Sequence, residues 1–188
     1  PIRQFYKKKQ NWYEKLINFN DNLDLFIEDG LIKDTKTLSI LNSKYHNDIL
    51  EISEEREKYF GKICSHLYKY KGICIIIDYG YYDPIKNFSI QSLYKHQKTS
   101  ILSNPGMQDI TSLVDFKNLI DIAKKNNLKI NTFCNQKKFL LSNGIKERKN
   151  KILEKCNLSE KKMIKNGFNR LIDINNMGSL FKVLVISS

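Results

Sequence analysis

The sequence lacks the short motifs by which many nucleotide-, metal- and cofactor-binding proteins are recognised. Among its eight glycines no two lie closer together than Gly72 and Gly80, so it contains no G-x-G turn and no G-K-[ST] loop. Its four cysteines show no C-x-x-C spacing, and its three histidines form no H-E-x-x-H pattern. No apolar run approaches the roughly 20 residues that a membrane-spanning helix needs. We therefore expect reduced, buried thiols, no metal site, no membrane span and no phosphate-cradling loop in this chain.

Acidic residues are scarce relative to basic ones. The chain has 32 Lys and Arg against 20 Asp and Glu, and its net charge of +12 is compatible with binding to nucleic acid or to an acidic membrane. The lysines are nevertheless scattered among abundant Asn and Ile, which favours solvated background charge over a dedicated phosphate-binding face. The first ten residues are basic but lack the apolar segment of a secretory signal. This pattern predicts a location in a bacterial cytoplasm.

The chain has the length of one domain with a buried core, since 41% of its 188 residues are hydrophobic. Residues 1–50 are polar, and short alternating pieces within them predict antiparallel strands or hairpins. Asp29-Gly30 has the composition of a turn, and residues 38–47 are expected to form a loop. The sequence thus predicts a small antiparallel β insertion over residues 1–50, followed by a second part over residues 51–188.

A helix and a strand begin this second part. Ser53 has the chemistry of an N-cap, acidic residues follow it where they favour the helix dipole, and Gly72 marks the end of the helix. Ile73 to Ile77 is an unbroken apolar run, too short for a buried helix and rich in β-branched residues. It predicts a strand that is covered on both faces, as in a parallel sheet between helices.

Polar and aromatic residues follow that strand at once, in the run Asp78 to Tyr81. In open α/β sheets ligands bind in the crevice beyond the carboxyl ends of the strands. Residues 85–113 show little periodicity, and a loop of this length inside a compact domain is usually functional or disordered. His96 lies in this loop, which favours a role in a site over a role in the core. Residues 104–107 have the composition of an ordered turn.

The remaining sequence predicts an α/β order of elements. The expected elements are a helix capped by Asp115 and ending at Asn126-Asn127, a strand over 128–134, helices over 139–143 and 145–156, a short helix from Ser159, and a closing strand over 180–186. This order is typical of the second half of a Rossmann-like sheet.

Two long runs match a known pattern. Gly72 to Tyr81 matches G-x-x-L-I-I-D-Y-G-Y, and Pro105 to Phe116 matches P-G-x-x-D-L-T-A-H-V-D-F. Shorter matches are Pro1 to Phe5, His96, Gln136 with Phe139-Leu140, Gly144-Ile145 with Arg148, Arg170-Leu171, and Met177-Gly178 with Phe181 to Leu184. In this order, over nearly the whole chain, they resemble the MidA-like family of class I S-adenosylmethionine-dependent methyltransferases.

The resemblance implies a particular fold. It is the C-terminal half of a Rossmann-like class I methyltransferase sheet, made of strands five to seven, with the last strand antiparallel between the other two. The family's glycine-rich turn and the acidic residue that hold the methyl donor lie upstream of the matched region, so the cofactor-binding residues stay unknown. The family also has Gln-Gly-x-Phe where this chain has Gln136-Lys137. Mitochondrial members assist assembly of respiratory complex I, which implies the mitochondrial matrix if the source is eukaryotic.

The resemblance also implies a chemistry, methyl transfer from S-adenosyl-L-methionine to an arginine of a protein substrate, with a complex I subunit as the partner. Because arginine stays protonated at ordinary pH, carboxylates must orient the guanidinium and draw its charge away from the attacking nitrogen. The catalytic candidates are Asp78, Tyr79, His96 and Asp109. The substrate-binding candidates are Tyr81, Gly106, Thr111, Asp115 and Gln136.

Several of these residues also have a structural interpretation. Asp78 can stabilise a turn, Asp115 fits a helix cap better than a site residue, and Asp109 with Thr111 can hold a local turn. The glycines, Gly80 and Gly106 among them, are most simply backbone requirements.

Three functions stay open on the sequence alone. The first is the substrate-side part of a protein arginine methyltransferase, inactive by itself, whose missing N-terminal half is a possible separate chain. The second is a non-catalytic assembly or interaction module of a respiratory complex. The third, less favoured, is a basic nucleic-acid-binding domain, whose affinity would fall steeply with salt.

Overall fold

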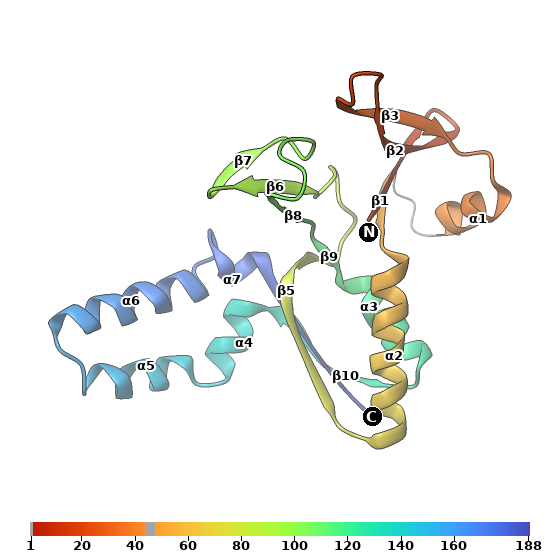
Figure 1. Cartoon of the computed structure of the whole chain (residues 1–188). Coiled ribbons are helices and arrows are strands. Elements are labelled where there is room, and N and C mark those ends of the chain that lie inside the picture. The colour runs from red at the N-terminus through yellow and green to blue at the C-terminus, as the bar shows by residue number, and fades with distance from the viewer. Residues whose placement is uncertain (1, 44–47) are drawn as a thin grey trace. The chain divides into compact units, whose positions relative to one another are not determined.

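The computed structural model describes residues 2–43 and 48–188, so Pro1 of the matched run and His46 lie outside the described residues. The fold is α/β with mixed sheets, as the sequence predicts (Figure 1). The chain divides into two compact units, residues 1–58 with 83–113, and residues 59–82 with 114–188. The predicted boundary near residue 50 differs from this division, because residues 83–113 return to the first unit.

The first unit contains a four-stranded sheet in the order β3-β2-β1-β4, antiparallel throughout. The strands are β1 (Arg3–Lys8), β2 (Asn11–Phe19), β3 (Leu25–Leu31) and β4 (Ile49–Ile52). Together with Leu41 of helix α1 (Thr35–Ser43), apolar residues of these strands form a small core. Its buried members are Phe5, Trp12, Leu41, Leu50 and Ile52. The antiparallel strands predicted over residues 1–50 are therefore present.

Two local predictions in this region are wrong. Asp29-Gly30 lies inside β3, opposite Lys15 and Glu14, and the turn falls at residues 20–24 instead. There the Asn20 side chain accepts hydrogen bonds from the backbone N–H groups of residues 22 and 24, a local bond that favours a turn without glycine. Residues 38–43 of the predicted loop are helical in α1, because Asp34 caps that helix through the N–H of Thr37 at 2.7 Å.

The long loop predicted over residues 85–113 contains a second sheet of the first unit. It has the order β7-β6-β8, with β6 (Gln91–Tyr94), β7 (Gln97–Thr99) and β8 (Asp109–Thr111). These strands have three or four residues, too few to show periodicity. The β6–β7 turn uses Lys95 and His96, with φ of 49° and 64°, so it carries none of the glycine or asparagine that signals a hairpin.

The second unit is built on a sheet in the order β10-β11-β5-β9. Its strands are β5 (Ile73–Tyr81), β9 (Val114–Asp115), β10 (Lys129–Asn135) and β11 (Phe181–Ser187). The last strand, β11, lies between β10 and β5 and is antiparallel to both. On its other edge β5 pairs with β9 only at Gly80 and Tyr81. Among the described residues, no strand therefore pairs with that edge over residues 73–79.

The expectation that both faces of Ile73 to Ile77 are covered is wrong for this chain. Cys74 and Ile76 pack on the core that helices α2 (Glu54–Tyr70) and α3 (Phe116–Lys125) form with β11. On the opposite face the exposed fractions of the residues are 67% for Ile73, 55% for Ile75 and 46% for Ile77. The β-branched run predicted the strand correctly, but it could not tell which face receives a cover within the same chain.

Helices α2 and α3 begin as the sequence predicts. Ser53 accepts a hydrogen bond from the N–H of Arg56, and α2 ends at Tyr70, before the positive φ angles of Lys71 and Gly72. Ile52 precedes this cap and belongs to β4. The Asp115 side chain accepts a hydrogen bond from the N–H of Asn118 at 3.0 Å and so caps α3.

An arm of helices connects β10 with β11. It consists of α4 (Gln136–Ser142), α5 (Ile145–Leu153), α6 (Leu158–Ile172) and the short α7 (Met177–Leu180). Helices α5 and α6 lie side by side and run in opposite directions (Figure 1). Asn157 and Glu160 form a reciprocal capping box at the start of α6, with two hydrogen bonds of 2.9 Å. This cap fixes the start of α6, which extends over 15 residues and is longer than the short helix that the sequence predicts.

Candidate functional site

One group of predicted site residues lies at the carboxyl end of β5. The carboxylate of half-buried Asp78 accepts a hydrogen bond from the backbone N–H of Tyr79 at 2.8 Å. Lys182 of β11 is the cross-strand partner of Asp78, and its ammonium group donates to the carbonyl of Ser179. Burial lowers the pKa of Lys182, because partial loss of hydration disfavours the charged ammonium form relative to the neutral amine. A carboxylate and a lysine thus stand on neighbouring strands at this strand end.

Aromatic rings surround the same strand end. The ring of Tyr79 meets that of Phe181 edge to face, with centroids 5.3 Å apart and planes at 87°. Tyr82 packs against Phe133 at 5.2 Å, and Phe133 in turn packs against Phe116 at 5.7 Å. Such pairs hold their rings in fixed orientations, so the strand end is bordered by ordered aromatic side chains.

Gly80 makes the close packing of this strand end possible. A Cβ atom on Gly80 would lie 2.3 Å from the carbonyl oxygen of Val114 and 2.7 Å from the ring of Phe116. Any side chain would therefore push β9 away from β5. In the resulting register Tyr81 lies opposite Asp115, which brings two of the predicted substrate-binding residues together.

Asp115 and Gln136 make hydrogen bonds that hold the backbone. Asp115 caps α3 through Asn118, in agreement with the structural interpretation of this residue. Gln136 is buried, and its amide donates to the carbonyl of Leu171 at 2.9 Å, which joins the start of α4 to the end of α6. Their roles in substrate binding stay predictions.

A second group of predicted residues lies in the small sheet of the first unit. His96 is exposed at the β6–β7 turn. Asp109 and Thr111 belong to β8, where Asp109 pairs with Leu93, three residues before His96. Gly106, with a φ of 79°, lies in the turn that the N–H of Met107 closes on Asn104 at 2.9 Å. The turn predicted at residues 104–107 is confirmed, and the sheet brings Asp109 near the end of the hairpin that carries His96.

A buried carboxylate that the sequence analysis missed is the centre of a hydrogen-bond network in the first unit. Glu51 of β4 accepts from the side-chain amide of Gln4 at 2.7 Å and from the backbone N–H groups of Ser89 at 2.9 Å and Ile90 at 3.3 Å. The Ser89 hydroxyl also donates to Glu51 and itself accepts from the N–H of Leu113 at 2.9 Å. The sequence feature that could have indicated this buried carboxylate is its position in the middle of the apolar run 49–52.

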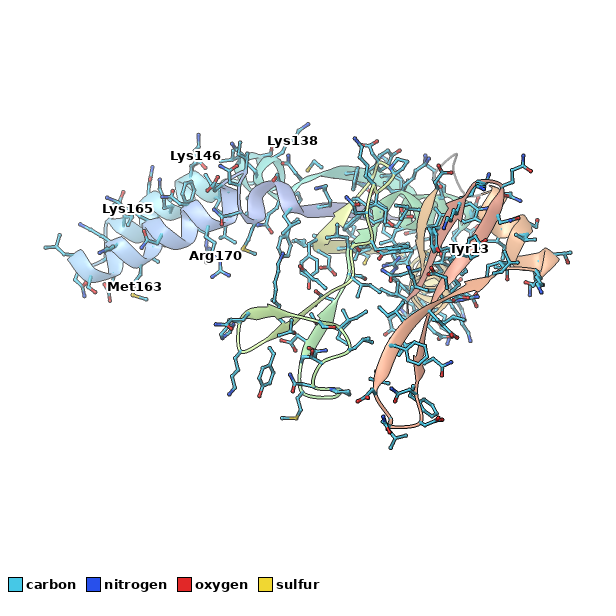
Figure 2. All side chains as sticks on the ribbon, turned by 90° about the horizontal axis from the view of Figure 1, so that it is seen from above. Tyr13, Lys138, Lys146, Met163, Lys165 and Arg170 are labelled. Atoms are coloured by element: carbon cyan, nitrogen blue, oxygen red, sulfur yellow. The ribbon has the colours of Figure 1, made fainter. Side chains whose placement is uncertain are left out.

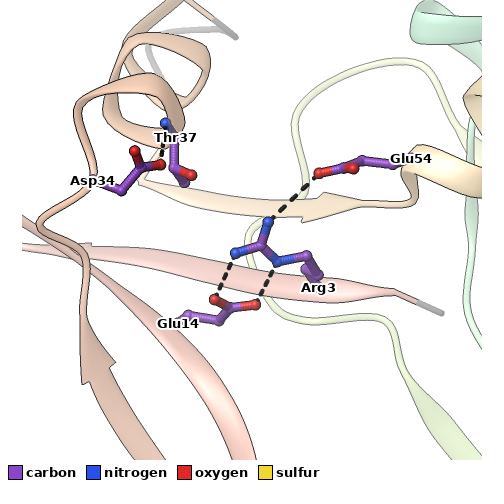
Figure 3. A network of polar contacts seen from close by, with 5 residues as sticks. All are labelled: Arg3, Glu14, Asp34, Thr37 and Glu54. Atoms are coloured by element: carbon purple, nitrogen blue, oxygen red, sulfur yellow. Dashed lines mark hydrogen bonds and ion pairs between the residues drawn. The ribbon is translucent and has the colours of Figure 1, made fainter.

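A second buried carboxylate pairs with an arginine on the same sheet (Figure 3). Arg3 donates two hydrogen bonds to Glu14, at 2.7 and 2.8 Å, and lies 3.5 Å from a carboxylate oxygen of Glu54. The hydrogen bond with Glu14 raises the pKa of Arg3. Fully paired networks of this kind rigidify a sheet. Arg3 and Gln4 of the matched run 1–5 thus support the fold of the first unit.

The architecture defines an α/β protein whose described helices include none that is long and apolar enough to cross a membrane. Two crystal structures from Burkholderia thailandensis have the same fold. One is an uncharacterized COG1565 superfamily protein, with a TM-score of 0.85 and 22% identity over all of this chain and 52% of the other. The second, a superfamily member bound to S-adenosyl-homocysteine, has a TM-score of 0.84 and 22% identity, and half of its chain is covered.

The sequence model of one family matches residues 1–134. That family is described as "Putative S-adenosyl-L-methionine-dependent methyltransferase", and the chain belongs to it. This agrees with the MidA-like resemblance of the sequence.

Curated relatives carry a more specific name. A Caenorhabditis elegans protein named "Protein arginine methyltransferase NDUFAF7 homolog, mitochondrial" is 26% identical over 187 residues, which are 97% of this chain and 43% of the relative. The human "Protein arginine methyltransferase NDUFAF7, mitochondrial" is 22% identical over 99% of this chain and 42% of its own length. The chain thus spans less than half the length of these relatives.

Proposed function

We propose that this chain is the C-terminal, substrate-side part of an S-adenosyl-L-methionine-dependent protein arginine methyltransferase. The names of the relatives and the family description support this activity. The observation that carries the proposal is the sheet order β10-β11-β5, with the antiparallel β11 in the middle, in a fold shared with a protein bound to S-adenosyl-homocysteine. A complex I subunit is the proposed protein substrate, in a bacterial cytoplasm or a mitochondrial matrix.

The free edge of β5 supports a role for a further half of the protein. A groove of about 520 Å³ runs beside this edge and is lined by residues of β5 and α2, among them Ile73, Ile75, His66 and Leu67. An apolar strand whose N–H and C=O groups have no strand partner readily pairs with another strand. We infer that the donor-binding half, with its glycine-rich turn, pairs here, and that this chain does not catalyse methyl transfer alone.

Each group of polar residues described above offers a carboxylate for the proposed chemistry. The donor, when bound, supplies an electrophilic methyl group. One of the two candidate carboxylates, Asp78 or Asp109, holds the substrate guanidinium and draws its positive charge toward its oxygens, so that one nitrogen is free to attack the methyl carbon while the bond from this carbon to the donor sulfur breaks. The proton that this nitrogen loses passes to a base, for which His96 is the candidate in the small sheet. At the end of β5, Tyr79 and Tyr81 are the candidates that border the guanidinium plane.

Binding of S-adenosyl-homocysteine tests the proposal. Isothermal titration calorimetry would compare this chain with a longer product that includes residues encoded further upstream. We expect the longer product to bind with a Kd near or below about 100 μM and this chain to bind at least about tenfold more weakly, because the donor site belongs to the other half. Binding by neither product would refute the methyltransferase assignment. Equal affinity of both products for S-adenosyl-homocysteine would refute the inference that the donor site belongs to the other half.

A non-catalytic assembly module is the second candidate, favoured by the lack of a G-x-G turn in this chain. It predicts a stable complex with a respiratory subunit and no methylated arginine. Pull-down followed by mass spectrometry of the captured subunit distinguishes the two functions, because only the first leaves a mass increase on an arginine.

A further inference from the structure

Two thirds of the net charge of the chain lies on helices α4 to α6 of the arm. Residues 136–172 contain eleven Lys and Arg and three Glu, a net charge of +8 within a total of +12. In the linear sequence these cations alternate with apolar and asparagine residues and look scattered. Helices α5 and α6, which carry most of these cations, pack side by side (Figure 1), so cations that are separated in the sequence share one part of the structure. The interpretation of the lysines as solvated background charge stays a prediction.

The arm also has an open apolar groove. A cavity of about 660 Å³ lies between α5 and α6, next to the end of α4. Its apolar lining includes Ile145, Ile152, Ile164 and Phe168, which are half-buried, and neither α5 nor α6 contains a buried residue. Met163 at the groove is 71% exposed. Helices normally bury one apolar stripe, so this hairpin leaves such a stripe uncovered.

Cationic side chains border the groove. Arg148 and Lys149 belong to its lining, and the Lys149 ammonium group lies 4.3 Å from the centre of the Phe168 ring. Figure 2 shows Lys138 and Lys146 at one side of the arm, with Met163 and Arg170 at the other. The site therefore combines an apolar floor with a positively charged rim.

We propose that this groove binds an acidic amphipathic helix of a partner protein. A helix placed in a groove buries one apolar face there and presents its acidic flanks to the rim, so shape and charge both complement the site. The 15 residues of α6 extend over about 22 Å, enough for four turns of a bound helix. This interaction goes beyond the proposed methyl transfer, because it uses residues outside both groups of candidate site residues.

Two other occupants fit the observations less well. Single-stranded nucleic acid is bound through several aromatic rings on which bases stack, whereas Phe168 is the one aromatic residue in the lining. A membrane surface is flat and favours apolar residues that project outward, whereas most of the apolar lining here is recessed between two helices.

Gly167 offers a direct way to block the groove. It belongs to the lining, and a Cβ atom on it would meet no heavy atom within 4 Å. Gly167→Phe should therefore fill the groove without displacing the backbone, and Gly167→Ala is the matched control because it adds a Cβ atom and leaves the groove open. Arg148→Glu reverses one charge of the rim. Far-UV circular dichroism verifies that each variant is folded.

The probe is an 18-residue helical peptide with leucines on one face and glutamates elsewhere, measured by fluorescence anisotropy. We expect binding that weakens with salt, and about tenfold weaker binding by Gly167→Phe and by Arg148→Glu, whereas Gly167→Ala binds as the native chain does. A scrambled peptide of the same composition should bind about tenfold more weakly.

Three outcomes would overturn the proposal. They are equal binding of the scrambled peptide, unchanged affinity of the folded Gly167→Phe variant, and tighter binding to phosphatidylglycerol vesicles or to single-stranded DNA than to the peptide. The last outcome would assign the arm to a membrane or to nucleic acid.

Discussion

At the scale of single residues, Gly80 shows how one missing side chain determines a strand end. Its Cα lies so close to β9 and to the ring of Phe116 that a methyl group has no room. Gly61, in the middle of α2, is the contrasting case, since a Cβ atom there would meet nothing within 4 Å. The same substitution should therefore have opposite effects at the two positions.

We expect Gly80→Ala to lower the free energy of unfolding by roughly 2 kcal/mol or more, because the Val114 carbonyl must move. Gly61→Ala should raise it by about 0.5 to 1 kcal/mol, since alanine loses less backbone entropy in a helix. Urea unfolding followed by circular dichroism measures both changes. A loss at Gly80 no larger than the error of the method would show that β9 is not held against β5 as described.

Buried carboxylates illustrate what residue-level reasoning missed. The apolar run around Glu51 is the one local sign that this carboxylate is buried, whereas Glu14, next to Lys15, resembles any exposed residue. Their partners come from far along the chain, since Ser89 lies 38 residues after Glu51. By contrast, Asp115 was recognised as a cap from its local sequence alone, because a cap acts on the next three residues.

At the scale of elements, α3 allows the two interpretations of Asp115 to be separated. Asp115→Ala removes the hydrogen bond to the Asn118 N–H and should lower the free energy of unfolding by about 1 kcal/mol, whereas Asp115→Asn should retain most of it, because asparagine caps equally well. Thermal unfolding of the three proteins gives this comparison.

The asparagine variant also tests the predicted substrate role of Asp115. A cap alone tolerates the loss of charge, whereas a residue that holds a guanidinium does not. If methyl transfer by the longer product falls at least about tenfold in Asp115→Asn while its stability is unchanged, Asp115 contacts the substrate. Unchanged activity leaves it as a cap.

Strand β5 could be predicted from the sequence, whereas the small sheet of β6, β7 and β8 could not. A run of five apolar residues was enough to locate β5, because strand propensity and length act locally. The three short strands of the small sheet escaped detection, since each is stabilised by its neighbours and by a turn with positive φ at non-glycine residues.

At the scale of the whole molecule, stability should fall in alkaline solution. Burial raises the pKa of the Cys64 thiol from 9.0 to about 11, because the thiolate is poorly solvated in the core of the second unit. A group whose pKa is raised on folding stabilises the protein fully below its unfolded pKa. That contribution is lost as the pH rises from about 9 to 11, and it amounts to roughly 2 kcal/mol.

Urea unfolding at pH 8 and pH 11 measures this loss. Other groups also titrate in this range, so the comparison is with Cys64→Ala, whose stability starts lower because of the cavity but should fall by roughly 2 kcal/mol less between the two pH values. Equal losses of stability in both proteins would show that the native core does not raise the pKa of the Cys64 thiol.

The sequence by itself determined the features that depend on neighbouring residues and on local patterns of composition. These include the caps at Ser53 and Asp115, the strands β5 and β11, the turn at residues 104–107, and the family to which the chain belongs. Each follows from interactions over a few positions or from matching short runs of residues.

The tertiary structure alone decided the rest, namely which edge and which face of β5 stay open, how Glu51 and Glu14 are paired, and which cations of the arm border the groove between α5 and α6. These features depend on which distant segments meet, and the free energy of such contacts comes from burial and pairing that no local pattern contains.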